Sequence, residues 1–153
     1  MTFRNRPRQR TKVSRFLLIF FSFSLLIGAG AIFLLFFEGE KPRINLEKSS
    51  SYIGKSGNFN YSVTDEQSGI HSVVVWATQG NVKKLLHSVT YPRTTYTGPI
   101  GPLEESGTVT FDVKKEGFVD GPMTLTFEAT DFSLRGWLTG NKAVATKEVT
   151  VDT

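Results

Sequence analysis

The feature that most constrains this chain is an uninterrupted run of 22 uncharged residues from Phe16 to Phe37. Sixteen of these residues are Phe, Leu or Ile. At a rise of about 1.5 Å per residue, a helix of this length is about 33 Å long and spans a hydrocarbon core of about 30 Å. The run therefore predicts a transmembrane helix that begins at Phe16 and ends at Phe37.

A cleaved signal peptide is the alternative, because Ala29-Gly30-Ala31 resembles a small-residue cleavage site. The apolar core of a signal peptide is normally about 7 to 15 residues long. In this chain the apolar run continues for six residues beyond Ala31, so cleavage would leave a hydrophobic N-terminus on the product. We therefore favour an uncleaved signal-anchor.

Charge asymmetry sets the expected orientation of this helix. Residues 1–15 contain no acidic residue and six basic ones, namely Arg4, Arg6, Arg8, Arg10, Lys12 and Arg15. Because positively charged flanks stay in the cytoplasm, these six residues are expected to determine the topology. We expect a cytoplasmic tail over 1–15, one span of the inner membrane over 16–37, a linker over 38–42 and a periplasmic or extracytoplasmic domain over 43–153.

The charge of the remaining chain argues against a nucleic-acid partner. From Glu38 onward there are twelve Lys or Arg and fourteen Asp or Glu, which gives this part a net charge of −2. The overall excess of positive charge thus belongs to the tail, whereas a nucleic-acid-binding domain needs a basic folded surface. The chain also has no cysteine, which excludes thiol catalysis, cysteine zinc sites and iron–sulfur clusters.

Alternation of apolar and polar residues predicts an all-β domain after the linker. The pattern indicates seven strands separated by turn residues, at 43–47, 58–64, 70–78, 82–90, 108–114, 123–130 and 143–151. Seven short strands in about 110 residues are typical of an immunoglobulin-like antiparallel β-sandwich. The inward side of the alternation is expected to be Phe59, Tyr61 and Val63 in the second strand, Val109, Phe111 and Val113 in the fifth, Met123, Leu125, Phe127 and Ala129 in the sixth, and Val149 and Val151 in the seventh. Trp76 is expected to fill the core of that sandwich, and an open barrel is the alternative fold.

No residue pattern in the chain predicts an enzyme, a cofactor site or a small-molecule substrate site. His71 and His87 have no second ligand at metal spacing and are expected to be surface imidazoles. Four oxygen-bearing residues end strands or lie in loops and are candidates for a calcium site: Asp65, Glu66, Asp131 and Asn141. Asp65 follows the strand at 58–64 and Asp131 follows the strand at 123–130, so we expect both at one end of the sandwich. Asx turns at the strand ends explain the same residues without an ion, so we expect no metal.

The loop from Asp131 to Asn141 is the strongest candidate for binding. It is long, and Arg135 and Trp137 within it are residues able to contact a partner protein or a glycan. The alternative is that its apolar residues, including Phe132, Leu134 and Trp137, fold back and cover the end of the core.

Several motifs along the chain occur together in one known family. They are Glu38-Gly39-Glu40-Lys41-Pro42-Arg43-Ile44 after the anchor, Tyr52-Ile53-Gly54, the stretch from Val63 to Val73 around Ser68-Gly69-Ile70, Asp120-Gly121, Ala129 to Arg135, Gly140-Asn141 and the ending Val149 to Thr153. The chain resembles the N-terminal part of membrane-anchored M23 (LytM-like) metallopeptidases. The resemblance implies an anchor and an Ig-like domain that precede a zinc peptidase domain acting on peptidoglycan cross-links.

The chain departs from that family in its catalytic motifs. Neither His-x-x-x-Asp nor His-x-His is present in these 153 residues, so no catalytic residue carries over. We therefore expect a non-catalytic anchor and spacer module, as a truncated product, a fragment or a stand-alone protein. The alternative is an autonomous module that binds an envelope protein or a glycan such as peptidoglycan.

Overall fold

The computed structural model describes residues 12–36, 39–47, 50–95, 100–134 and 139–153. It divides into two units, Met1–Leu35 and Phe36–Thr153, and each is treated by itself below. Among the predicted topology and membrane-end residues, Arg4, Arg6, Arg8, Arg10 and Phe37 lie outside the described residues.

The first unit contains the predicted apolar helix. Helix α1 runs from Lys12 to Phe36, so it begins four residues before the expected Phe16 and includes Arg15 in its first turn. Its apolar side chains are exposed on every side, with Phe16 and Ile19 each 69% exposed. A helix that is hydrophobic all round requires an apolar surrounding. The stretch from Ser14 to Phe33 is long and apolar enough to cross a membrane once, a property that signal sequences share.

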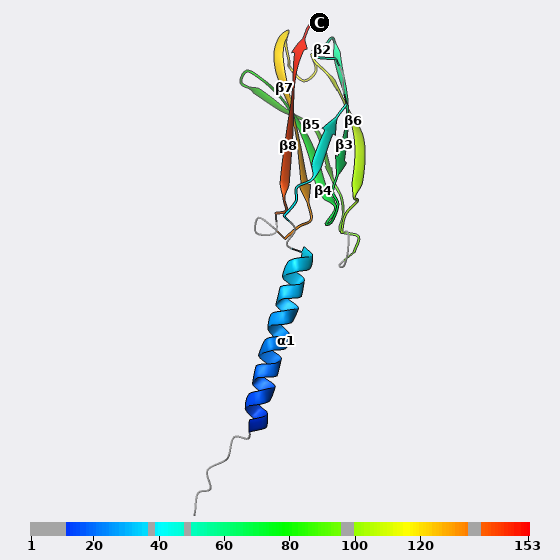
Figure 1. Cartoon of the computed structure of the whole chain (residues 1–153). Helices are drawn as coiled ribbons and strands as arrows, with labels where there is room; N and C mark the ends of the chain where they lie inside the picture. Colours follow the sequence, from blue (N-terminus) through cyan, green and yellow to red (C-terminus); the bar gives the residue numbers. More distant parts are fainter. Residues whose placement is uncertain (1–11, 37–38, 48–49, 96–99, 135–138) are drawn as a thin grey trace, which may run out of the picture. The chain divides into compact units, whose positions relative to one another are not determined.

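The described residues of the second unit form eight strands in two sheets (Figure 1). The strands are β1 (Arg43–Leu46), β2 (Tyr52–Ile53), β3 (Ser56–Thr64), β4 (Ile70–Gln79), β5 (Val82–Thr90), β6 (Glu104–Asp112), β7 (Gly121–Asp131) and β8 (Lys142–Val151). One sheet has the order β1-β3-β6 and the other the order β2-β8-β7-β4-β5. All pairs are antiparallel except β2 with β8. The predicted all-β class after an apolar helix is therefore confirmed.

The strand positions agree with the sequence pattern except at two places. All seven predicted strands are present, although β6 begins and ends a few residues earlier than expected. The pattern missed β2, because a strand of two residues is too short to alternate. This strand nevertheless adds buried Ile53 to the core and pairs with the end of β8.

The core lies between the two sheets and is formed by the inward-facing residues of the alternating strands. It contains the inward residues predicted for four strands, namely Phe59, Tyr61, Val63, Val109, Phe111, Val113, Met123, Leu125, Phe127, Ala129, Val149 and Val151. Aromatic rings fill its centre: the rings of Phe59 and Phe111 stack at 6.2 Å between centroids, and those of Tyr61 and Phe127 lie 5.8 Å apart.

The expectation that Trp76 fills the core is wrong. Its neighbours Val75 and Ala77 are fully buried and face the core, so alternation along β4 turns the Trp76 side chain to the outer face. There the Lys83 ammonium lies 4.6 Å from the centre of a Trp76 ring. The sequence did not decide the direction, because both faces of this strand carry large apolar residues.

Replacement of Phe127 or Trp76 by Ala should show, from the loss of stability, which of the two side chains lies in the core. Phe127→Ala should lower the free energy of unfolding by about 3–5 kcal/mol, because it removes a buried ring at the centre of the core. Trp76→Ala should cost only about 1 kcal/mol, because the side chain lies on the outer face and is only partly buried. Urea denaturation of both variants measures this difference, and similar losses would contradict the orientation of β4.

Candidate binding site at the linker end of the sandwich

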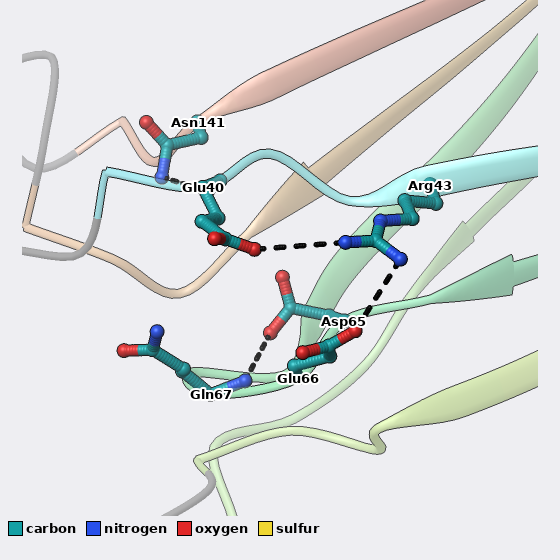
Figure 2. A network of polar contacts seen from close by, with 6 residues as sticks. All are labelled: Glu40, Arg43, Asp65, Glu66, Gln67 and Asn141. Atoms are coloured by element: carbon teal, nitrogen blue, oxygen red, sulfur yellow. Dashed lines mark hydrogen bonds and ion pairs between the residues drawn. The ribbon is translucent and has the colours of Figure 1, made fainter.

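Three segments that are distant in the sequence meet at one end of the sandwich. They are the linker residues 39–42 before β1, the β3–β4 turn at 65–69, and the two ends of the β7–β8 loop at 131–134 and 139–141. Figure 2 shows six of the polar residues involved. We refer to this region as the linker end.

The β3–β4 turn is organised by the side chain of Asp65, which is only 5% exposed. Its Oδ1 accepts hydrogen bonds from the backbone N–H groups of Gln67 at 3.2 Å and Gly69 at 2.7 Å, as in an Asx turn. Gly69 has a φ of +85°, and a Cβ there would collide with the backbone of Gly101. The turn thus depends on both an acceptor at 65 and a glycine at 69.

The β7–β8 loop is closed at its base by Asp131, which is 1% exposed. Its Oδ1 accepts hydrogen bonds from the backbone N–H groups of Ser133 at 3.0 Å and Asn141 at 2.6 Å. Its Oδ2 accepts a third from Asn141 Nδ2 at 2.8 Å. Gly140 has a φ of +82°, and a Cβ there would collide with the carbonyl oxygen of Asp131.

The linker is tied to this loop base through Asn141. Its Nδ2 donates a hydrogen bond to the carbonyl oxygen of Glu40 at 2.7 Å, from a side chain that is itself buried. Arg43 adds two ion pairs, to Glu40 at 3.8 Å and to Glu66 at 3.4 Å (Figure 2). All three of those side chains are more than 60% exposed, and exposed ion pairs contribute only about 0–1 kcal/mol. The Asn141 contact therefore fixes the linker more firmly than the ion pairs do.

Two buried carboxylates lie close together at this end, as the strand assignment predicted. Burial raises the pKa of Asp65, and the neighbouring Asp131 raises this pKa further, while the backbone N–H groups of Gly69 and Gln67 lower it. The fold brings the four candidate calcium ligands to one end of the sandwich, namely Asp65, Glu66, Asp131 and Asn141. The carboxylate oxygens of Asp65 and Asp131 accept N–H hydrogen bonds from the turns. The described residues contain no group of three or more acidic, His or Cys residues able to hold a metal.

Both histidines, expected to be surface imidazoles, are partly buried. His87 is half-buried, and its Nε2 lies 3.1 Å from the hydroxyl of buried Tyr61. His71 is also half-buried, and its ring packs against Phe132 at 4.7 Å between centroids. A β-bulge in β5 explains His87: the pairing shifts between Val75 and Trp76, which turns His87 inward opposite Val75.

A second group of polar side chains, which includes Tyr61, Tyr91 and Glu105, lies around His87 and was not predicted from the sequence. Burial, followed by the charge of Glu105, raises the pKa of the Tyr91 hydroxyl to about 12. The same two causes raise the pKa of Tyr61. Glu105 pairs with the inward residue Val63, and Gly107 pairs with the inward residue Tyr61. A polar or small residue at an inward position of a strand is the sequence signal that could have revealed this polar group.

Arg135 and Trp137 lie outside the described residues, so their binding role stays a prediction. The adjoining Phe132 is half-buried against His71, and the Arg93 guanidinium lies 5.9 Å from its ring. A Cβ on Gly101 would also collide with the Phe132 ring. Phe132 therefore packs against His71 and Gly101. Trp137 lies outside the described residues, so the alternative that this loop covers the end of the core also stays a prediction.

Comparison with known proteins assigns no family. No protein-family model and no curated protein matches the chain. Among solved structures, a beta-glucosidase from Listeria innocua in complex with glucose is similar, with a TM-score of 0.40 and 12% sequence identity. The similarity covers 76% of this chain but only 17% of the glucosidase chain. At this level the comparison assigns neither fold family nor function.

Removal of the Asn141 amide should destabilise the domain. Asn141→Ala should lower the free energy of unfolding by about 1–3 kcal/mol, because Oδ2 of Asp131 loses a donor while it remains buried. Asn58→Ala, at an exposed position in β3, serves as the matched control and should change it by less than about 0.5 kcal/mol. Equal effects of the two changes in urea denaturation would contradict this role for Asn141.

Asp65 should make the stability of the domain pH-dependent. A carboxyl whose pKa is raised in the folded state stabilises the fold below its unfolded pKa and loses that contribution as pH rises through the folded value. From pH 3.8 upward, the wild type should therefore lose stability relative to Asp65→Asn, which keeps the Oδ1 acceptor. Urea denaturation as a function of pH measures the difference, and a constant offset across this range would disprove the assignment.

Proposed function

We propose that this protein is a membrane-anchored, extracytoplasmic immunoglobulin-like module that serves as a non-catalytic spacer. It holds an envelope component, such as a peptidoglycan endopeptidase of the M23 type, at a set distance from the inner membrane. The observation that carries the proposal is the hydrogen bond from Asn141 to the linker carbonyl of Glu40, because it attaches the linker to the fold.

The strand order supports the immunoglobulin-like part of this proposal. An immunoglobulin fold has A, B and E in one sheet and G, F and C in the other, with C′ beside C in variable-type domains. The sheet β1-β3-β6 matches A-B-E, and β8-β7-β4-β5 matches G-F-C-C′. The short β2, which is parallel to β8, then takes the place of a second segment of the first strand.

The positions of the two chain ends of the domain support a spacer. Arg43 starts β1 at the linker end, whereas β8 runs from Lys142 at that end to Val151 at the opposite end (Figure 1). Ten residues of extended strand separate these ends by about 30 Å. Thr153 is held at the far end as well, because its N–H and Oγ1 both donate to Asp120 at 2.9 Å.

The family resemblance supports the architecture more than the activity. Most of its motif residues, such as Asp65, Gly69, Asp131, Gly140 and Asn141, form the turns and the loop base described above. Peptidase chemistry would therefore have to reside in a component carried by the module.

Fluorescence quenching by the bilayer tests the spacer directly. The chain has no cysteine, so single probes can be attached at Gln67→Cys in the β3–β4 turn and at Asp152→Cys beyond β8, both exposed. In vesicles with a headgroup-labelled acceptor lipid, the probe at 67 should be quenched strongly and the probe at 152 weakly, since they differ by about 30 Å in depth. Equal quenching of the two probes would refute an upright spacer.

A further inference from the structure

The two outer faces of the sandwich differ in chemistry. The outer face of β3 and β6 carries only amides, hydroxyls and charges, as in Asn58, Asn60, Ser62, Ser106, Thr108 and Thr110. Such a surface is well solvated and needs no partner. The outer face of the five-stranded sheet is different, and we refer to its part formed by β8, β7, β4 and β5 as the large face.

The large face has an apolar centre. Trp76 of β4 pairs laterally with Leu85 of β5, and the next row contains Val74 of β4. Val144 on β8 belongs to the same row as Val74, through their shared neighbour Glu128 on β7. Leu85 is 49% exposed and Val144 is 56% exposed, so apolar side chains on both outer strands of this face remain in contact with solvent.

Opposite charges lie at two corners of the large face. Lys83 on the edge strand β5 and Glu148 on β8 belong to one lateral row, which runs through Thr78 and Thr124. Both are exposed, and no ion pair is formed by either within the part of the chain that the structure describes. The other carboxylate of the face, Glu128, is already paired with Lys142 at 2.7 Å.

We propose that the large face binds a second copy of this chain, around a two-fold axis parallel to the strands. That axis places β5 of one copy over β8 of the other, so that Lys83 faces Glu148 of the second copy and Glu148 faces its Lys83. It also places Trp76 of one copy over the small residue Thr126 of the other copy. The face is thus complementary to itself in charge and in size, as an isologous interface requires.

The membrane anchor decides between the two possible axes in the plane of the face. An axis parallel to the strands puts both linker ends at the same end of the dimer, where both helices enter one membrane. An axis perpendicular to the strands would put the linker ends about 30 Å apart along the strands, at opposite ends. The dimer therefore forms between copies anchored in the same membrane, which goes beyond the proposed spacer role and does not require a peptidase.

The size of the face indicates a weak association that depends on the anchor. Four strands at about 4.8 Å spacing and four lateral rows at about 6.7 Å give a footprint of about 500 Å², below the roughly 800 Å² per partner of a standard interface. Confinement to one membrane raises the effective concentration of the second copy. We therefore expect dimers in membranes and few dimers of the detergent-dispersed chain at low concentration.

Disulfide trapping in the full-length chain tests the proposal, since the native sequence has no cysteine background. With Lys83→Cys and Glu148→Cys in one chain, oxidation in native membranes should yield a disulfide-linked dimer on a non-reducing gel. Three strand spacings, about 14 Å, separate the two positions within a copy, too far for an internal disulfide. Either substitution alone should yield no dimer, because equivalent positions lie on opposite edges of the interface.

Two controls separate a specific interface from random collision. Lys83→Cys with Thr110→Cys puts the second cysteine on the polar face and should yield no dimer. Adding Thr126→Arg to the Lys83/Glu148 cysteine pair should reduce the trapped dimer to the level of the single variants, whereas adding Thr110→Arg should leave it unchanged. Absence of a dimer from the Lys83/Glu148 pair, or an equal yield from the Lys83/Thr110 pair, would overturn the proposal.

Discussion

The buried carboxylate of Asp131 is the interaction on which the linker end of this domain depends. A carboxylate removed from water is tolerated only when several donors satisfy it, and here two backbone N–H groups and the Asn141 amide do so. These bonds close the β7–β8 loop at its base and leave the second Asn141 N–H to hold the carbonyl of Glu40. One charged group thus joins two strands, a loop and the linker, and the spacer proposal requires this connection.

Much of the fold follows from the sequence because alternation is a strong signal for half-buried strands. It located the seven longer strands and the inward residues of β3, β6, β7 and β8. It failed at Trp76, where both faces of β4 are apolar and only the neighbouring sheet determines which side is buried. It also failed at His87, because a β-bulge changes the direction of a side chain without leaving a mark in the pattern.

The candidate site was predicted in part, and the missing part is a matter of long-range contacts. That Asp65 and Asp131 share one end followed from their positions at strand ends. That Asn141 also contacts Glu40, 101 residues away in the chain, could not follow from local patterns. The contrast between a polar outer face and a partly apolar one likewise emerges only when the strands are placed in register, since Trp76, Leu85 and Val144 come from three separate strands.

Native-state amide hydrogen exchange tests the central claim, which is that the Asp131 carboxylate fixes the base of the β7–β8 loop. The N–H groups of Ser133 and Asn141 lie in a loop by sequence, but both donate to Asp131 in the structure. They should therefore exchange as slowly as amides in the centres of β7 and β8. Exchange of these two amides at the rate of an exposed loop, while the strands stay protected, would contradict the account.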